Sequence, residues 1–325
     1  MKFCIVGAGA IGGYLGAKLA LAGAEVTLIA RGAHLQAIQQ RGLQLISADG
    51  TSDIGHPIAT TADITTVGAQ DVVILAVKAH SLPAIAPYLP ALYHADTMVV
   101  TAQNGIPWWY FRKHGGEYEG TTIQVVDPNG VVEANIGTDR VIGCVVYPAA
   151  EIQSPGVIRH IEGDRFSLGE IDGVKTDRIQ QLATAFKQAG IKAPIRNQIR
   201  GELWVKLWGN LAFNPISALT GATLEEICQY LPSRVLVYQM MSEALAIAEK
   251  LEVRMGISLE QRIEGAEKVG AHKTSMLQDI EANRSTEIDA IVGAVAELGR
   301  LLDIPTPHID AVYASVKLLE KTKNT

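Results

Sequence analysis

Three polar residues recur at a regular spacing inside an apolar stretch that runs from Leu203 to Ser217. They are Lys206, Asn210 and Asn214, each four residues from the next. On an α-helix this spacing places the three side chains along one face. Burying a lysine and two amides is costly without partners, and partial desolvation lowers the pKa of a lysine. The pattern predicts a lysine proton donor beside two hydrogen-bonding amides. The alternative is a lysine that reaches solvent beside amides that cap a neighbouring helix.

A glycine-rich segment follows the first apolar run and precedes the first helical pattern. In such a turn the first glycine permits a tight bend and the second lets a pyrophosphate approach the backbone, while the third lets the helix pack against the strand. The free N–H groups at the helix start then bind the phosphates. A glycine-rich turn without a ligand is the alternative. The residues predicted to bind a dinucleotide are Gly7, Ala8, Gly9, Ala10, Ile11 and Gly12.

The end of the second predicted strand indicates which dinucleotide is bound. Enzymes that use NAD usually place an acidic residue there, near Ala30, to hold the ribose 2′-hydroxyl. This chain has Arg31 and no acid at that point. An arginine suits a 2′-phosphate, so the sequence favours NADP over NAD. A surface arginine with no ligand remains the alternative.

Two further polar residues follow later strands of the predicted sheet. Lys78 comes after the run Val72 to Val77, and Asn104 comes after Met98 to Thr101. Ligands of open α/β sheets bind beyond the carboxyl ends of the strands, so both residues are candidates for the site. A solvated lysine and a turn asparagine are equally good interpretations. The aromatic run Trp108-Trp109-Tyr110-Phe111 follows, either as a lid or pocket wall or buried against a second domain or subunit.

A second polar group lies near the end of the chain. Ser275 and Gln278 have the spacing of a capping box, in which the two side chains satisfy the backbone at a helix start. Glu287 precedes an apolar helical pattern, where the helix dipole stabilises an acid. From the residues alone both are structural.

Composition excludes several classes of protein. With 48% hydrophobic and 19% charged residues, the 325-residue chain is not intrinsically disordered and has room for two cores. A net charge of −6 has the wrong sign for a nucleic-acid binder. No apolar run reaches the roughly 18 residues of a membrane span, and the opening Met1 to Val6 is too short for a secretory signal. Cys4, Cys144 and Cys228 are far apart, which predicts neither a disulfide framework nor a metal site. We expect a cytoplasmic protein.

The order of elements predicts two domains. Strands are expected at 3–6, 25–29, 72–77, 98–101, 122–126, 140–146, 156–161 and 166–169, with a hairpin at Pro155-Gly156. Strands that alternate with helices indicate a parallel sheet. Helices are expected at 177–189, 199–214, 233–250 and 284–302, and the polar tail from Glu320 to Thr325 is expected to fray. We therefore predict an α/β domain over residues 1–195 and an all-helical domain over residues 196–325.

Taken together, the motifs resemble a known family, the ketopantoate reductases (2-dehydropantoate 2-reductases), in order along the whole chain. The resemblance implies a Rossmann-type NADP-binding domain followed by a helical domain similar to the C-terminal domain of 6-phosphogluconate dehydrogenase. It implies reduction of 2-dehydropantoate to pantoate with NADPH, in pantothenate biosynthesis. We also expect a homodimer. The motifs that carry the resemblance are Gly7-x-Gly9-x-x-Gly12, Val77-Lys78-Ala79, Asn104-Gly105, Lys206-x3-Asn210-x3-Asn214-Pro215-x-Ser217, Thr274-Ser275-Met276-Leu277-Gln278-Asp279 and Glu287-Ile288-Asp289.

The resemblance also implies a role for each site residue. Lys206 would be the proton donor and Glu287 the second catalytic residue. Cofactor contacts would come from the glycine segment and from Arg31, Lys78, Asn104 and Ala149. Substrate contacts would come from Asn104, Lys206, Asn210, Asn214 and Ser275.

Two features depart from the pattern of the pantothenate enzyme. Leu224 stands where that enzyme has a further substrate-contacting asparagine, and the aromatic stretch from Pro107 to Phe111 is not its usual short sequence. Reduction of a different 2-oxo acid is therefore one alternative. A non-catalytic NADP-binding regulatory protein is another, although a protein without turnover has no need of Lys206, Asn210 and Glu287.

Overall fold

The computed structural model describes residues 1–323 and divides the chain into two compact units. The first unit consists of Met1–Gln103, Phe111–Thr122 and Asn129–Ile199. The second unit consists of Asn104–Tyr110, Ile123–Pro128 and Arg200–Thr325. Two short segments from the first half of the chain thus pack with the C-terminal helices. The predicted boundary between residues 195 and 196 stays a prediction, while the packing changes from the first unit to the second at residues 199 and 200.

A seven-stranded sheet forms the centre of the first unit, in the order β11-β8-β7-β6-β1-β2-β5. All neighbours are parallel except β11, which runs antiparallel to β8. The central strands are wholly buried apolar runs, as expected for a parallel sheet covered on both faces. The strands are β1 (Lys2–Val6), β2 (Glu25–Ile29), β5 (Ala59–Thr61), β6 (Val72–Leu75), β7 (Met98–Thr101), β8 (Val141–Val146) and β11 (Phe166–Glu170).

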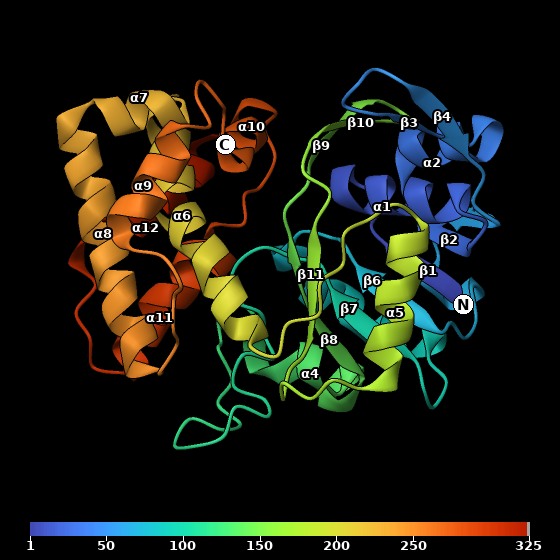
Figure 1. The fold of residues 1–325 in the computed structure, drawn as a ribbon, viewed down its shortest axis with the longest axis horizontal. Helices are drawn as coiled ribbons and strands as arrows, with labels where there is room; N and C mark the ends of the chain where they lie inside the picture. Colours follow the sequence, from blue (N-terminus) through green and yellow to red (C-terminus); the bar gives the residue numbers. More distant parts are fainter. Residues whose placement is uncertain (324–325) are drawn as a thin grey trace. The chain divides into compact units, whose positions relative to one another are not determined.

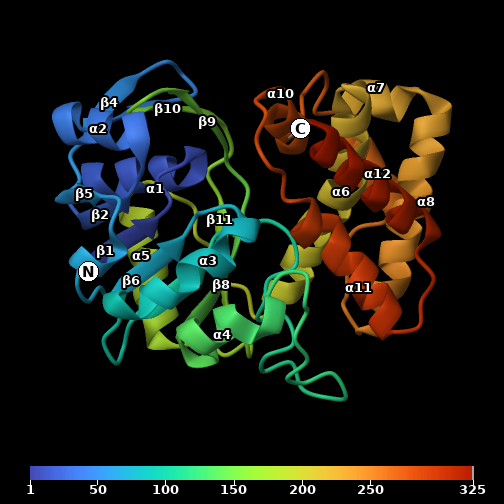
Figure 2. The ribbon, with the colours of Figure 1, turned by 180° about the vertical axis from the view of Figure 1, so that it is seen from behind.

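Helices cover both faces of this sheet. Figure 1 shows α1 and α5 on one face, and Figure 2, from behind, shows α3 and α4 on the other. Leu15 and Leu19 of α1 join Leu182 and Phe186 of α5 in one buried cluster with the sheet. The helices are α1 (Ala10–Leu21), α2 (Gly32–Arg41), α3 (Leu82–Ile85), α4 (Val131–Ile136) and α5 (Asp177–Gln188), with 3₁₀ turns at Ile64–Thr66, Ala79–Ser81, Ala86–Leu92, Pro128–Gly130 and Thr138–Arg140.

A four-stranded sheet, in the order β4-β3-β10-β9, completes the first unit. Its strands are β3 (Leu43–Ile46), β4 (Ser52–Gly55), β9 (Ala149–Ser154) and β10 (Val157–Glu162). The predicted hairpin is confirmed, since β9 and β10 pair antiparallel around Gly156, whose φ is +80°. The prediction of a strand at 122–126 is wrong. That segment is a turn, in which the N–H of Val126 donates to the carbonyl of Ile123.

The described part of the second unit is helical and contains no strand. Its elements are α6 (Ile199–Thr220), α7 (Leu224–Gln229), α8 (Leu231–Lys250), α9 (Leu259–Glu267), α10 (Ser275–Glu281), a π-helical turn (Asp289–Gly293), α11 (Ala294–Leu301) and α12 (Pro307–Lys323). The α/β and all-helical fold classes are both confirmed. No helix in residues 1–323 is long and apolar enough to cross a membrane.

Two helix boundaries differ from expectation by more than two residues, and so does the expected fraying of the tail. Helix α6 continues through Pro215 to Thr220, because residues 211–218 are buried and their packing outweighs the lost backbone hydrogen bond. The helix expected from residue 284 begins only at Ile288, and its first turn is π-helical. Helix α12 extends to Lys323, so the expected fraying is wrong for residues 320–323, and residues 324–325 lie outside the described chain.

Candidate active site

Lys206, Asn104 and Glu287 meet within the second unit. The Lys206 Nζ donates to Asn104 Oδ1 at 2.7 Å, and Asn104 Nδ2 donates to a Glu287 carboxylate oxygen at 3.2 Å. The amide therefore presents its oxygen to the cation and its N–H to the anion. Glu287 is only 7% exposed, which strengthens charge-assisted hydrogen bonds relative to those in water. The predicted lysine is thus part of a hydrogen-bonded chain rather than a solvated surface group.

The turn after β7 brings Asn104 to this position. The next two residues pack on the π-helical turn: Ile106 N–H donates to the carbonyl of Ala290 at 2.8 Å, and a Cβ on Gly105 would lie 2.3 Å from the same oxygen. Gly105 also has a φ of +89°, a conformation that favours glycine. The backbone approach at Gly105 therefore holds Asn104 against the segment that carries Glu287.

The other two polar residues of α6 follow Lys206 in successive turns, as predicted. Asn210 is half-buried, and Asn214 is buried at 6% exposure. Near the end of the helix, Ser217 Oγ donates to the carbonyl of Ala222 and fixes the turn toward α7. The helix therefore presents a lysine and two amides on one face of an otherwise apolar element.

Ser275 does not cap a helix. The residue that caps α10 is Thr274, whose Oγ1 accepts a hydrogen bond from the N–H of Leu277 at 3.2 Å. Ser275 is the first helical residue and its side chain is exposed. The capping-box interpretation of Ser275 and Gln278 is therefore wrong, and the Ser275 hydroxyl is accessible to a ligand.

The glycine segment joins β1 to α1 and includes the first residues of the helix, in the first unit. A Cβ on Gly12 would lie 2.0 Å from the carbonyl oxygen of Gly7, so the third glycine is required for close packing of α1. A Cβ on Gly9 would meet no protein atom within 4 Å. The space in front of Gly9 is thus open, which fits a turn whose second glycine makes room for a pyrophosphate.

The remaining cofactor candidates also lie in the first unit. Arg31 is exposed and directly precedes α2, after the carboxyl end of β2. Lys78 is half-buried and directly precedes the 3₁₀ turn Ala79–Ser81, three residues after the end of β6, and Ala149 is the first residue of β9. The strand order places β1 between β2 and β6, which is the switch point where open α/β sheets bind ligands.

The aromatic run after Asn104 is part of a core. Trp108, Trp109, Tyr110 and Phe111 are all at most 3% exposed. The Trp204 indole on α6 donates to the Tyr110 hydroxyl at 2.7 Å, and burial raises the pKa of Tyr110 to about 12. Of the two interpretations, burial against the helical unit is correct for Trp108 to Tyr110, and these residues are not a lid.

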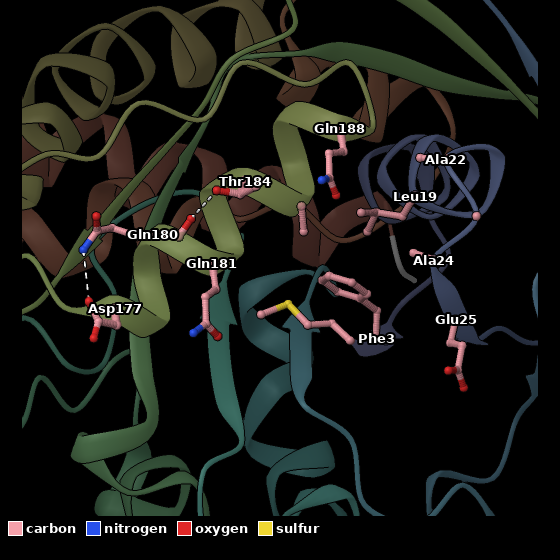
Figure 3. Close-up of a pocket in the computed structure, with 13 residues that line it drawn as sticks. Phe3, Leu19, Ala22, Ala24, Glu25, Asp177, Gln180, Gln181, Thr184 and Gln188 are labelled. Atoms are coloured by element: carbon pink, nitrogen blue, oxygen red, sulfur yellow. Dashed lines mark hydrogen bonds between the residues drawn. The ribbon is translucent and has the colours of Figure 1, made fainter.

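A groove of about 680 Å³ lies at the opposite end of β1 from the glycine segment (Figure 3). It is bordered by the start of β1, the end of α1 and one face of α5. Its polar side chains on α5 include Gln180, Gln181 and Gln188, and none of the predicted site residues lines it. Among residues 1–323 no group of His, Cys, Asp or Glu side chains is arranged to hold a metal ion.

Comparison with known proteins identifies the family. The family model described as "Ketopantoate reductase PanE/ApbA" matches residues 3–173, and "Ketopantoate reductase PanE/ApbA C terminal" matches residues 198–320. The chain belongs to the ketopantoate reductase family. It is 56% identical to a 2-dehydropantoate 2-reductase of Mesorhizobium japonicum, over 98% of both chains. It is 30% identical to a protein of that name from Pyrococcus horikoshii, also over 98% of both chains.

A solved structure shares the fold of this ketopantoate reductase family member. It is a Ralstonia solanacearum protein provisionally assigned to the ketopantoate reductases, with a TM-score of 0.94 and 43% sequence identity. The match covers 99% of this chain and 98% of that one.

Proposed function

We propose that the protein is an NADPH-dependent 2-dehydropantoate 2-reductase, which reduces ketopantoate to pantoate in pantothenate biosynthesis. The observation that carries the proposal is the hydrogen-bonded chain from Lys206 through Asn104 to the buried Glu287. It supplies a cationic proton donor next to a fixed amide and a carboxylate. The relative with 56% identity has the same activity in its name, which supports this substrate.

The proton chemistry falls to Lys206. Bound NADPH supplies the hydride that reduces the keto carbon. Lys206 Nζ polarises the carbonyl oxygen, stabilises the negative charge that develops there and donates the proton that completes the hydroxyl group. Asn104 holds the ammonium in place through its Oδ1, and Glu287 orients the Asn104 amide by accepting from its Nδ2.

Cofactor binding is assigned to the glycine segment of the first unit. The N–H groups at the start of α1 would bind the pyrophosphate, in the open space before Gly9. Arg31 would bind the 2′-phosphate, and Lys78, Ala149 and Asn104 would contact the rest of the cofactor. These residues fit NADPH because a cation, and no acid, follows β2.

Substrate binding is assigned to polar residues of the second unit. Asn210 and Asn214, on the Lys206 face of α6, would hold substrate oxygens. The exposed hydroxyl of Ser275 would bind the substrate carboxylate.

The experiment that tests the function is NADPH oxidation with ketopantoate, beside a panel of 2-oxo acids with other side chains and an NADH control. We expect kcat/KM for ketopantoate above about 10⁴ M⁻¹s⁻¹, within the usual enzyme range. We also expect Arg31→Ala to weaken NADPH binding and leave NADH binding unchanged. A higher kcat/KM for another 2-oxo acid would contradict the assignment of ketopantoate as the substrate. A protein that binds NADPH but does not oxidise it with any of the 2-oxo acids would be a regulatory protein instead.

We also propose a homodimer in the cytoplasm. Leu231, Val235 and Tyr238 form an exposed apolar stripe on α8 at 68%, 47% and 47% exposure, with uncharged Gln239 beside it. A twofold interface brings the same surface against itself, so an uncharged stripe avoids like-charge repulsion. Light scattering of the wild-type protein and of Val235→Glu tests the dimer, which the variant should dissociate.

The cysteines support the proposed location in the cytoplasm. They are buried and form no disulfide in the described chain, which fits a reducing compartment.

A further inference from the structure

Glu287 lies in a short non-helical link between α10 and the π-helical turn. Residues 284–286 have no helical backbone pattern, and the helical backbone resumes at Ile288. A buried carboxylate at this point has helix hydrogen bonds on its carboxyl-terminal side only, so further contacts are needed to keep it in one orientation. The structure shows these contacts on the two sides of Glu287.

One face of α12 holds the chain before and after Glu287. On the amino-terminal side, the N–H of Thr286 donates to a Glu320 carboxylate oxygen at 2.7 Å. On the carboxyl-terminal side, Asp289 accepts from the Tyr313 hydroxyl at 2.6 Å and from Lys317 Nζ at 3.0 Å. Tyr313, Lys317 and Glu320 have the spacing i, i+4, i+7, which places them on one stripe of the helix.

The π-helical turn links this stripe to the other site residues. The carbonyl of Glu287 accepts from the N–H of Ile291, and the carbonyl of Ala290 accepts from the N–H of Ile106, two residues after Asn104. The ring of Tyr313 also packs against Gly293, where a Cβ would lie 2.9 Å from the ring. A shift of the turn would therefore move Glu287 and Asn104 together.

We propose that Tyr313, Lys317 and Glu320 of α12 are positioning residues that fix Glu287 for the reduction. They act through their hydrogen bonds to Thr286 and Asp289. This inference rests on the proposed function for its effect on turnover. Its structural part, the immobilisation of residues 286–291 by α12, is independent of the substrate.

The test compares variants that remove one contact at a time. Tyr313→Phe deletes only the hydroxyl that donates to Asp289, and Glu320→Ala deletes the acceptor for the Thr286 N–H. Glu320→Gln retains an acceptor oxygen and is the conservative rescue. Ser315→Ala is the matched control, because the hydroxyl of this exposed α12 residue donates to the carbonyl of Ala311 in the same helix.

Two measurements are made on each variant. Steady-state kinetics should show kcat lower by about tenfold in Tyr313→Phe and in Glu320→Ala, and lower by up to about a hundredfold in the variant that carries both substitutions, the range expected for a small misplacement of a catalytic group. Binding of NADPH should change much less than kcat, since most of the proposed cofactor contacts lie in the first unit. Glu320→Gln and Ser315→Ala should keep the wild-type kcat. Amide hydrogen exchange should become faster at residues 104–106 and 286–291 in the damaging variants only.

Each outcome decides a separate question. A wild-type protein that does not reduce ketopantoate contradicts the proposed function, whereas hydrogen exchange still tests the positioning. Unchanged exchange in Tyr313→Phe and Glu320→Ala would overturn the positioning. Lower thermal stability with unchanged kcat would assign the α12 stripe a purely structural role and would also overturn it.

Discussion

The ammonium of Lys206 donates to the side-chain oxygen of Asn104, although 102 residues separate the two along the chain. The contact exists because the segment 104–110 leaves the seven-stranded sheet and packs with the helical unit. The lysine of α6 and the turn after β7 therefore belong to one compact unit. The chemistry assigned to Lys206 depends on this long-range contact as well as on its own helix.

Replacing Lys206 with methionine should abolish most of the turnover. Methionine has a similar length and no proton to donate, so kcat should fall by about 10²–10⁴-fold, the usual contribution of general acid catalysis. NADPH binding should change little, because the glycine segment belongs to the first unit. The measurements are single-turnover NADPH oxidation and a fluorescence titration with NADPH. Lys250→Met, at the exposed end of α8, is the matched control. A Lys206→Met protein with most of the wild-type kcat would refute the assigned role.

Two alanine substitutions in the glycine segment should have opposite effects. Gly9→Ala adds a Cβ that meets no protein atom within 4 Å, so the free energy of unfolding should hardly change. The affinity for NADPH should fall at least about tenfold, because the methyl group occupies the space for the pyrophosphate. Gly12→Ala places its Cβ 2.0 Å from the Gly7 carbonyl and should lower the free energy of unfolding by about 2 kcal/mol or more. Urea denaturation and NADPH titration separate the two effects. Normal NADPH affinity in Gly9→Ala would contradict the assigned cofactor site.

Local patterns were sufficient to predict part of the site. The spacing of four residues between Lys206, Asn210 and Asn214 predicts that they share one helix face. The spacing of the glycines predicts the turn between β1 and α1. Both are properties of neighbouring residues, which periodicity records directly. Only the family resemblance points to Glu287, because its contact with Asn104 joins residues 183 positions apart.

Other elements could not be predicted because long-range contacts determine them. The β-branched residues at 122–126 indicate a strand, but the N–H groups of Gln124 and Val125 donate to the Glu297 carboxylate of α11 instead of to a neighbouring strand. The strands β4 and β5 are short and partly exposed, with no alternation of apolar residues that could reveal them. The sequence does not single out Tyr313, Lys317 and Glu320, because their spacing is common to many solvated helices.

The Cys4 thiol should make the protein less stable in alkaline solution. Burial in β1 raises its pKa from 9.0 to about 12, so the folded state retains a proton that the unfolded chain loses. The stabilisation is fully present below pH 9 and decreases as the pH rises from 9 toward 12. The free energy of unfolding should therefore fall more steeply over this range in the wild-type protein than in Cys4→Ala. Urea denaturation at several pH values measures both slopes, and equal slopes would show that the thiol does not contribute.

The backbone approach at Gly105 should be essential for both stability and turnover. Gly105→Ala combines an unfavourable φ of +89° with a Cβ only 2.3 Å from the Ala290 carbonyl oxygen. Gly115→Ala is the matched control, because its φ is +76° but its Cβ would meet nothing within 4 Å. The control should lose only the conformational part, about 1 kcal/mol, whereas Gly105→Ala should lose about 3 kcal/mol or more.

The kinetic effect of Gly105→Ala has the same cause as its loss of stability. A displaced Gly105 also displaces Asn104, so the amide can no longer bridge Lys206 and Glu287. Measured well below the melting temperature, kcat should fall about a hundredfold in Gly105→Ala and stay at the wild-type value in Gly115→Ala. Equal losses of stability in the two variants, or a normal kcat in folded Gly105→Ala, would mean that the contact with Ala290 does not hold Asn104 in place.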